Sequence, residues 1–521
     1  MLIRLFGNFI KEKRMRRPTH IIIFVHGWSV TNINTYGGLP YRLQEEAGKY
    51  GIAIELKEIF LGEYISFDDE IRVRDVARAF QKAIFDKLSP YADRKIPIIC
   101  ITHSTGGPVI REWWNKYHIE KGTRCPISHL IMLAPANFGS GLAKLGKKAI
   151  SRFMSFLKNV EPGTGILEWL EFGSQESWLL NQKWIQEMNP EKIIDNENGL
   201  YPFVITGDYI DRRLYDPAVP FTSEIGSDGV VRAAAANLNA RYVSIRQLFD
   251  AKDGLLVNEH YTLSENTAPE TAFLIVNRKS HSGDNMGIMK SVASASPDPN
   301  AETVKAIMKC ILIKDDIGYK NLCDEFNEQT RFNQTDERIE PAEWRNYITM
   351  RTKPYIHDRY AMIIFRVKDS EGFPVSFYEA ILTGGIEGSY EYFPEGFMGK
   401  KQKNDNNPGV LTYYLNYDLL HGMSEVRGKD NQIIRQGNKS IDMLGLEIYP
   451  YPGNGFVFYK PLKIQHSKEF FDLLIKENGT VMVDITLERM VSEKTFELNE
   501  VPGLSISKDF RDKPPTKNAV E

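Results

Sequence analysis

Residues 102–107, with the sequence Thr-His-Ser-Thr-Gly-Gly, combine a nucleophile with the signals of a sharp turn. The apolar run at 98–101 is typical of a buried strand, and a helical pattern follows the turn. Such a corner would expose the Ser104 hydroxyl beside the N–H groups of a helix start, and Gly106 would let helix and strand approach closely. We therefore predict a serine nucleophile, although Thr102 stands where the usual GxSxG elbow has glycine; a chance serine in an ordinary turn is the alternative.

Alternating strand and helix signals over the first 310 residues predict the scaffold behind this serine. The β-branched run at 21–25 is typical of a parallel strand that is buried on both faces. Further strands are expected at 52–60, 130–134, 203–206 and 273–276, and helices at 68–88 and 109–117. This order predicts a doubly wound, mostly parallel sheet that binds ligands at the carboxyl ends of its strands.

The composition is that of an ordinary globular chain and excludes some function classes. The 521 residues are 42% hydrophobic and 26% charged, enough for a sizeable core. A formal net charge of -3 argues against a nucleic-acid partner, because phosphate neutralisation needs excess Lys and Arg. The four cysteines, Cys100, Cys125, Cys310 and Cys323, lack metal-ligand spacing and are interpreted as structural thiols of a reducing compartment.

The first twenty residues lack the apolar core and cleavage site of a signal peptide, so we expect synthesis as a cytoplasmic protein. No apolar run approaches the roughly 18 residues of a membrane span. The apolar residues of 2–9 share one helical face, and a basic stretch follows at 11–17. This segment either contacts an anionic membrane surface or packs on the protein body with a solvated basic loop after it.

Four motifs together resemble the α/β-hydrolase superfamily, in its lipase and esterase branch, over about residues 20–313. They are the turn at 102–107, His-Gly-Trp at 26–28, Gly-Ser-Asp-Gly-Val-Val at 226–231 and Ser-His-Ser-Gly at 280–283. Ser104, Asp228 and His281 follow the family's chain order of nucleophile, acid and base. The resemblance implies an oxyanion hole from the backbone N–H groups of Thr105 and Trp28, and no metal or organic cofactor.

Rival residues exist for two of these roles. Asp208 also follows a predicted strand and is the alternative acid, while His260, which precedes the last predicted strand, is the alternative base. His103 is interpreted as a supporting or packing residue, because adjacent side chains at a sharp turn point apart. His26 is interpreted as support for the oxyanion loop.

Residues 137–200 form an insertion longer than a minimal α/β unit needs. Its first apolar stripe contains Ile150, Phe153, Met154, Leu157 and Val160, and a second segment at 169–184 is rich in Trp and Leu. The insertion resembles a lipase lid, which would admit an apolar acyl chain. A helical subdomain packed permanently on the sheet is the alternative, and both favour acyl esters over sugars or peptides.

Beyond residue 313 the pattern changes. We predict a catalytic domain at 1–313, a linker with helices at 314–357, an antiparallel β-sandwich at 358–490 and a C-terminal extension at 491–521. Short strand-like runs between Gly, Pro, Asn and Asp turns define the sandwich.

The predicted function is hydrolysis of lipid carboxyl esters by a lipase- or phospholipase-like enzyme that contacts membranes peripherally. The lipase-like site without an export signal raises the hypothesis of an antibacterial effector, exported by a signal-peptide-independent machine and neutralised by an immunity protein. An intracellular esterase or thioesterase is one alternative. A non-catalytic binding protein on a hydrolase scaffold is another, although such a scaffold has no reason to keep Ser, Asp and His.

Overall fold

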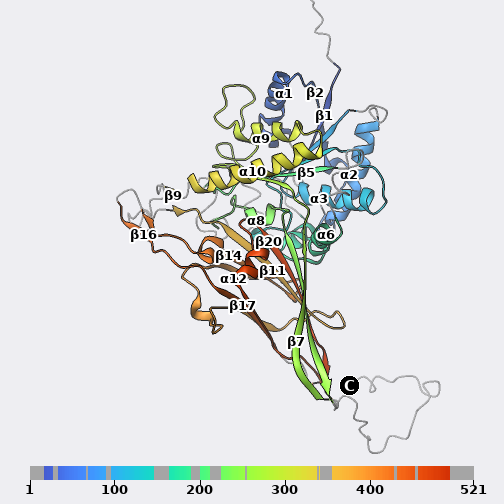
Figure 1. Ribbon diagram of the computed structural model, residues 1–521. Helices are drawn as coiled ribbons and strands as arrows, with labels where there is room; N and C mark the ends of the chain where they lie inside the picture. The colour runs from blue at the N-terminus through green and yellow to red at the C-terminus, as the bar shows by residue number, and fades with distance from the viewer. Residues whose placement is uncertain are drawn as a thin grey trace, which may run out of the picture.

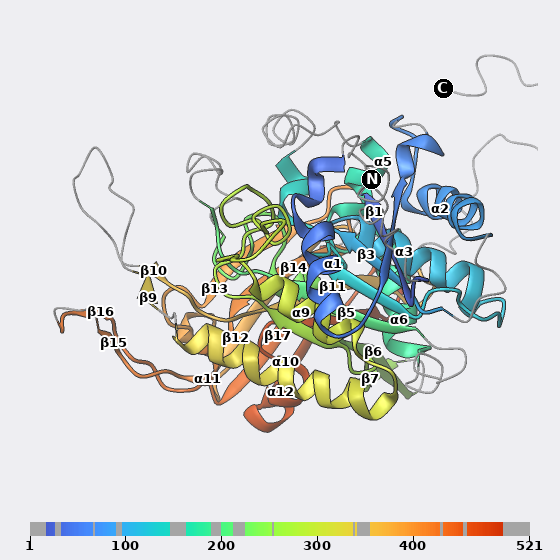
Figure 2. The ribbon, with the colours of Figure 1, turned by 90° about the horizontal axis from the view of Figure 1, so that it is seen from above.

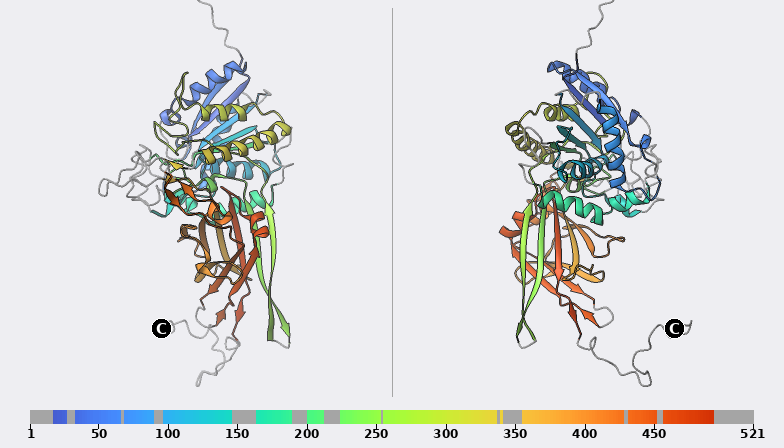
Figure 3. Two further views of the ribbon diagram at one scale, coloured as in Figure 1. Left: turned by 60° about the vertical axis from the view of Figure 1, so that its left-hand side comes forward. Right: turned by 90° about the vertical axis from the view of Figure 1, so that its right-hand side faces the viewer.

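The computed structural model describes most of the chain. The described residues are 17–26, 33–65, 68–89, 96–145, 163–188, 200–211, 224–252, 255–336, 339–340, 355–427, 431–451 and 456–492. Two units lie one above the other in Figures 1 and 3, an α/β unit and a β-rich unit. No helix among the described residues is both long enough and apolar enough to span a bilayer.

A parallel six-stranded sheet forms the centre of the α/β unit, in the order β2-β1-β3-β4-β5-β8. Its strands are β1 (His20–His26), β2 (Ile54–Phe60), β3 (Ile98–His103), β4 (His129–Leu133), β5 (Tyr201–Thr206) and β8 (Ala272–Ile275). Each predicted strand is present to within a few residues. Side chains 21–25 of β1 are fully buried, as expected for a strand covered on both faces.

Helices cover both faces of this sheet, as Figure 2 shows from above. On one face lie α1 (Leu39–Lys49), α9 (Glu302–Ile311) and α10 (Asp316–Asp336). On the other lie α2 (Val73–Leu88), α3 (Gly106–Trp114), α5 (Thr164–Leu170) and α6 (Gln175–Gln186). Each face has its own apolar core, so the predicted doubly wound α/β fold is confirmed.

The β-rich unit contains two sheets that enclose a third apolar core. The larger sheet consists of β13 (Met398–Lys403), β14 (Val410–Asn416), β11 (Tyr360–Asp369), β20 (Thr480–Leu487), β6 (Arg241–Lys252) and β7 (Leu255–Thr267). The smaller one consists of β12 (Tyr378–Gly384), β17 (Met443–Pro450) and β19 (Leu462–Ser467). All pairings are antiparallel except those of β20, which runs parallel to both β11 and β6. The predicted β-sandwich fold is therefore present, with one parallel strand inside it.

Several shorter α-helices and strands are also present. They are α8 (Ala233–Ala236), α11 (Tyr417–His421), α12 (Lys468–Leu474) and the strand pairs β9 (Ile339–Glu340) with β10 (Tyr355–Ile356), β15 (Val426–Arg427) with β16 (Ile433–Arg435), and β18 (Val457–Phe458) with β21 (Met490–Val491).

The division of the chain between the units differs from the predicted boundaries at two places. The β6–β7 hairpin lies inside the predicted catalytic span 1–313 but pairs through β6 with β20 of the β-rich unit. Helix α10 lies in the predicted linker 314–357, yet its Tyr319, Leu322 and Phe326 are buried in the core of the α/β unit. Both differences arise from contacts between segments far apart in the sequence.

Candidate active site

A strained turn carries Ser104 between β3 and α3. Its φ of 55° lies in the left-handed region, which a residue with a side chain adopts only where its surroundings enforce it. The backbone N–H of Ser104 donates to the Leu133 carbonyl of the neighbouring strand at 3.0 Å. This is the geometry of a nucleophile elbow, in which the hydroxyl projects from the strand end.

Gly106 explains how the elbow tolerates Thr102 in place of glycine. A Cβ at Gly106 would lie 3.2 Å from the Thr102 Cβ, so the crossing has room for a side chain on one partner only. Thr102 is fully buried, and its hydroxyl has no hydrogen-bond partner among the described residues. A Cβ at Gly107 would lie 2.7 Å from the Cβ of Pro135, so Gly107 allows a close approach to the residues after β4 rather than to β3.

Ser104, His281 and Asp228 form one hydrogen-bonded chain. Ser104 Oγ lies 3.0 Å from His281 Nε2, and His281 Nδ1 lies 2.9 Å from Asp228 Oδ2. The carboxylate accepts a hydrogen bond from Nδ1–H, which leaves the Nε2 lone pair directed at the serine hydroxyl. Three side chains from distant parts of the sequence thus meet at the carboxyl end of the sheet, as predicted.

Asp228 is fully buried and its loop is rigidly hydrogen-bonded. Its Oδ1 accepts the backbone N–H groups of Val230 at 3.0 Å and Val231 at 2.7 Å, while Oδ2 faces His281. The Asp228 carbonyl also accepts the backbone N–H of His281 at 2.9 Å. Asp228 and His281 are therefore aligned by backbone as well as side-chain contacts.

His103 contacts His281 from the other side. Its Nε2–H donates to the His281 carbonyl at 3.0 Å, and the two ring centroids are 4.6 Å apart. Burial, with a smaller contribution from the nearby His281, holds the pKa of His103 well below its ordinary value. A neutral ring here adds no positive charge beside an imidazolium at His281.

The rival residues lie elsewhere. Asp208 Oδ2 accepts a hydrogen bond from Gln334 Nε2 of α10 at 3.1 Å. His260 lies on the β6–β7 hairpin, half exposed, with its Nδ1 4.0 Å from Asp250. The structure thus brings together the first-choice acid and base rather than these alternatives.

The predicted oxyanion residues are described in part. Thr105 directly precedes α3 and follows Ser104, so its backbone N–H is at the helix start. Trp28 and the side chain of His26 lie outside the described residues. Among the residues that are described, no three His, Cys, Asp or Glu side chains are grouped to hold a metal ion. All four cysteines are buried and unbridged.

The described part of the 137–200 insertion packs as core. Trp169, Trp178 and Trp184 of α5 and α6 are almost fully buried. Arg111 Nη1 of α3 donates to Asn181 Oδ1 at 3.0 Å, which ties α6 to the sheet-covering helices. The predicted stripe Ile150, Phe153, Met154, Leu157 and Val160 lies outside the described residues, so the lid stays a prediction.

Tyr414 of β14, in the β-rich unit, holds in place the loop of residues 224–232 that carries Asp228, called the acid loop below. Its hydroxyl lies 3.0 Å from the carbonyl oxygens of both Ile225 and Gly226, to which it donates. Gly226 has a φ of +74°, and a Cβ there would lie 2.5 Å from the Tyr414 hydroxyl. The loop that carries Asp228 is thus pressed directly onto the second unit.

Arg232 is the other residue of this contact, and sequence reasoning missed it. Its side chain is 1% exposed and forms two 2.8 Å hydrogen bonds with Glu224. The guanidinium lies between the rings of Phe172 and Tyr414, at 4.5 and 4.1 Å from their centroids. Arg232 directly follows the recognised motif at 226–231, but no local pattern distinguishes a buried arginine from a solvated one.

We expect Arg232→Met to lower the free energy of unfolding by about 3–5 kcal/mol, because it leaves the carboxylate of Glu224 mostly buried and without its partner. Urea unfolding followed by tryptophan fluorescence measures this change. Arg427→Met is the matched control, since it removes an exposed ion pair with Glu425 and should cost less than about 1 kcal/mol. Equal losses in the two variants would contradict the structural role of Arg232.

The parallel sheet, its helical layers and the serine elbow define an α/β-hydrolase of the lipase and esterase class. No family model and no curated protein matches the chain. Among solved structures, phospholipase PlaB from Legionella pneumophila is 38% identical, with a TM-score of 0.78 over 94% of this chain and 98% of that one. PlaB in complex with thio-NAD matches at 36% identity with the same TM-score and coverage. The chain belongs to the PlaB family and is a carboxylic ester hydrolase.

Proposed function

We propose that this protein is a phospholipase that cleaves the carboxyl esters of membrane lipids through Ser104, His281 and Asp228. The observation that carries the proposal is the hydrogen-bonded chain of these three side chains in a protein 38% identical to a phospholipase along nearly its whole length. Similarity supports the substrate class, and the geometry supports the residues.

In the first half-reaction Ser104 Oγ attacks the ester carbonyl carbon while His281 Nε2 removes the hydroxyl proton. Asp228 stabilises the resulting imidazolium through Nδ1–H. The negative charge that develops on the carbonyl oxygen needs preset donors. The backbone N–H of Thr105 is one, and that of Trp28 is the second donor that the family resemblance implies.

Collapse of the tetrahedral intermediate breaks the ester C–O bond, and His281 gives its proton to the leaving alcohol oxygen. Ser104 then carries the acyl group. Water enters, His281 removes a proton from it, and attack on the acyl carbon releases the fatty acid and restores the serine hydroxyl. Both half-reactions use the same proton site, Nε2.

Vesicles of phosphatidylglycerol or phosphatidylcholine, compared with soluble p-nitrophenyl butyrate, test this proposal. We expect fatty acid release from the vesicles, together with labelling of Ser104 by a fluorophosphonate. Hydrolysis of the soluble ester without fatty acid release would favour the esterase or thioesterase alternative. Loss of both activities and of labelling would favour a binding protein.

Export without a signal peptide, an antibacterial role and an immunity partner stay predictions from the sequence. Peripheral membrane contact accords with a phospholipid substrate, and vesicle flotation in the same assay measures it.

A further inference from the structure

A pocket of about 420 Å³ lies where the two units meet, and none of Ser104, Asp228 and His281 lines it. Its walls come from the loop before β6, the ends of β6 and β7, strand β8, helix α10 and the turn after α12. A volume of this size accommodates a small organic ligand rather than a bare ion.

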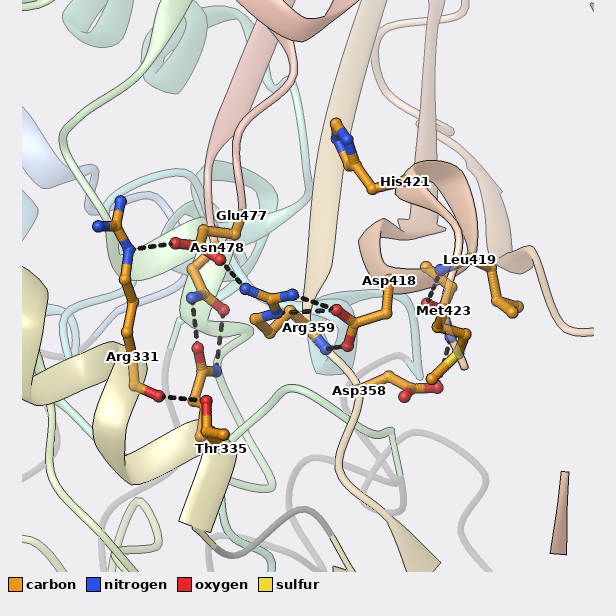
Figure 4. Close-up of polar contacts among 12 residues, drawn as sticks. Arg331, Thr335, Asp358, Arg359, Asp418, Leu419, His421, Met423, Glu477 and Asn478 are labelled. Atoms are coloured by element: carbon orange, nitrogen blue, oxygen red, sulfur yellow. Dashed lines mark hydrogen bonds and ion pairs between the residues drawn. The ribbon is translucent and has the colours of Figure 1, made fainter. Parts of the chain in front are cut away.

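Three cations line the pocket, and two of them form no ion pair within the described part of the chain. Arg331 Nε pairs with Glu477 Oε1 at 2.9 Å, and Figure 4 shows Glu477 also bonded to Arg359. Arg241 and Lys476 form no ion pair or side-chain hydrogen bond with any described residue. Burial lowers the pKa of Lys476, the positive charge of Arg241 lowers it further, and the carboxylates of Asp472 and Glu477 act in the opposite direction.

Acidic residues in and around the pocket offset its positive charge only in part. Glu477 is shared between Arg331 and Arg359. Glu270 is exposed, while the charge of Glu265 acts on Arg241 and the charges of Asp472 and Glu477 act on Lys476. With three cations and two carboxylates among its lining residues, the pocket keeps one excess positive charge.

Three of the four amide side chains in the wall already form hydrogen bonds within the protein. Asn237 Nδ2 donates to the Asn478 carbonyl at 2.9 Å, and the Asn239 amide bonds both backbone groups of Thr271. Asn478 pairs reciprocally with Gln334 of α10. A ligand would thus meet a preformed wall, which lowers the ordering cost of binding.

We propose that this pocket binds a small phosphate-bearing anion, with Arg241 and Lys476 as its charged ligands. A guanidinium offers a planar pair of donors and an ammonium a compact charge, and together they match the two charges of a phosphate monoester. The ligand is either a soluble phosphate ester or a lipid headgroup. Bound here, it lies between β6 and the turn after α12 on one side and α10 on the other, where the two units meet.

Isothermal titration with glycerol 3-phosphate at constant ionic strength tests the site. We expect saturable binding that Lys476→Gln and Arg241→Gln each weaken at least tenfold. Lys305→Gln, which removes an exposed paired lysine on α9, is the matched control and should bind like the wild type. Absence of saturable binding, or equal binding by the control and Lys476→Gln, overturns the proposal. Lys476 is exposed, so its variant stays informative if Arg241→Gln fails to fold.

Vesicles containing phosphatidic acid separate the two sources, with Ser104→Ala as the background to prevent hydrolysis. A headgroup ligand requires Lys476→Gln to weaken flotation with these vesicles relative to Lys305→Gln. Equal flotation of the two variants, with tenfold weaker glycerol 3-phosphate binding by Lys476→Gln, identifies a soluble phosphate ester.

Discussion

Ser104→Ala is expected to lower ester turnover by about 10⁴-fold or more and to abolish labelling by a fluorophosphonate, because the variant has no hydroxyl to form the acyl-enzyme. The triad acts as a unit, so a correctly placed His281 and Asp228 cannot compensate. Fatty acid release from phospholipid vesicles, measured beside labelling, checks the result.

The loss of activity in Ser104→Ala should come from the missing hydroxyl and not from a loss of folding. Alanine meets the same backbone strain at the φ of 55° that serine already adopts, so the free energy of unfolding should stay close to that of the wild type. Ser282→Ala is the matched control, since Ser282 follows His281 and its buried hydroxyl has no hydrogen-bond partner among the described residues. Labelling that persists in Ser104→Ala but disappears in Ser282→Ala would place the nucleophile at Ser282.

Local patterns were sufficient to predict the α/β sheet and the meeting of three side chains. Two predictions depended only on residues that are close in the sequence. The run at 21–25 predicted a strand that is buried on both faces, and the turn at 102–107 predicted a helix that crosses a strand at a glycine. Parallel strands bring their carboxyl ends to one edge, so residues after different strands were expected to converge there.

Contacts between distant segments could not be predicted in this way. The pairing of β6 with β20 places residue 241 beside residue 481. No sequence pattern in either strand identifies the strand with which it pairs. The mixture of charged and apolar residues in α10 is typical of a linker. Only the three-dimensional structure shows that its apolar residues are buried against the sheet. Arg232 and Tyr414 meet at the acid loop for the same reason, so the role of the β-rich unit in holding Asp228 was missed.

The contact between the acid loop and β14 changes the interpretation of the β-rich unit. Tyr414 and Arg232 connect that unit directly to the loop of Asp228. The second unit is thus a structural part of the candidate active site, in addition to any role in positioning the enzyme on its substrate.

Asp228→Asn is expected to reduce turnover by about 10⁴-fold through the wrong tautomer of His281. The structure dictates how an asparagine would orient. Its Oδ1 remains the acceptor for the backbone N–H groups of Val230 and Val231, so its NH₂ group must face His281 Nδ1. A donor there requires Nδ1 to accept, which moves the ring proton to Nε2 and removes the base from Ser104.

Steady-state kinetics with a soluble ester separates this effect from altered vesicle binding, and kcat should fall while KM changes little. Asp208→Asn is the matched control, because it makes the same change at the rival acid, whose carboxylate accepts from Gln334 outside the triad. We expect that variant to keep nearly full turnover. Near-normal turnover in Asp228→Asn, with a large loss in Asp208→Asn, would transfer the acid role to Asp208 and require the loop at 224–232 to rearrange in the active enzyme.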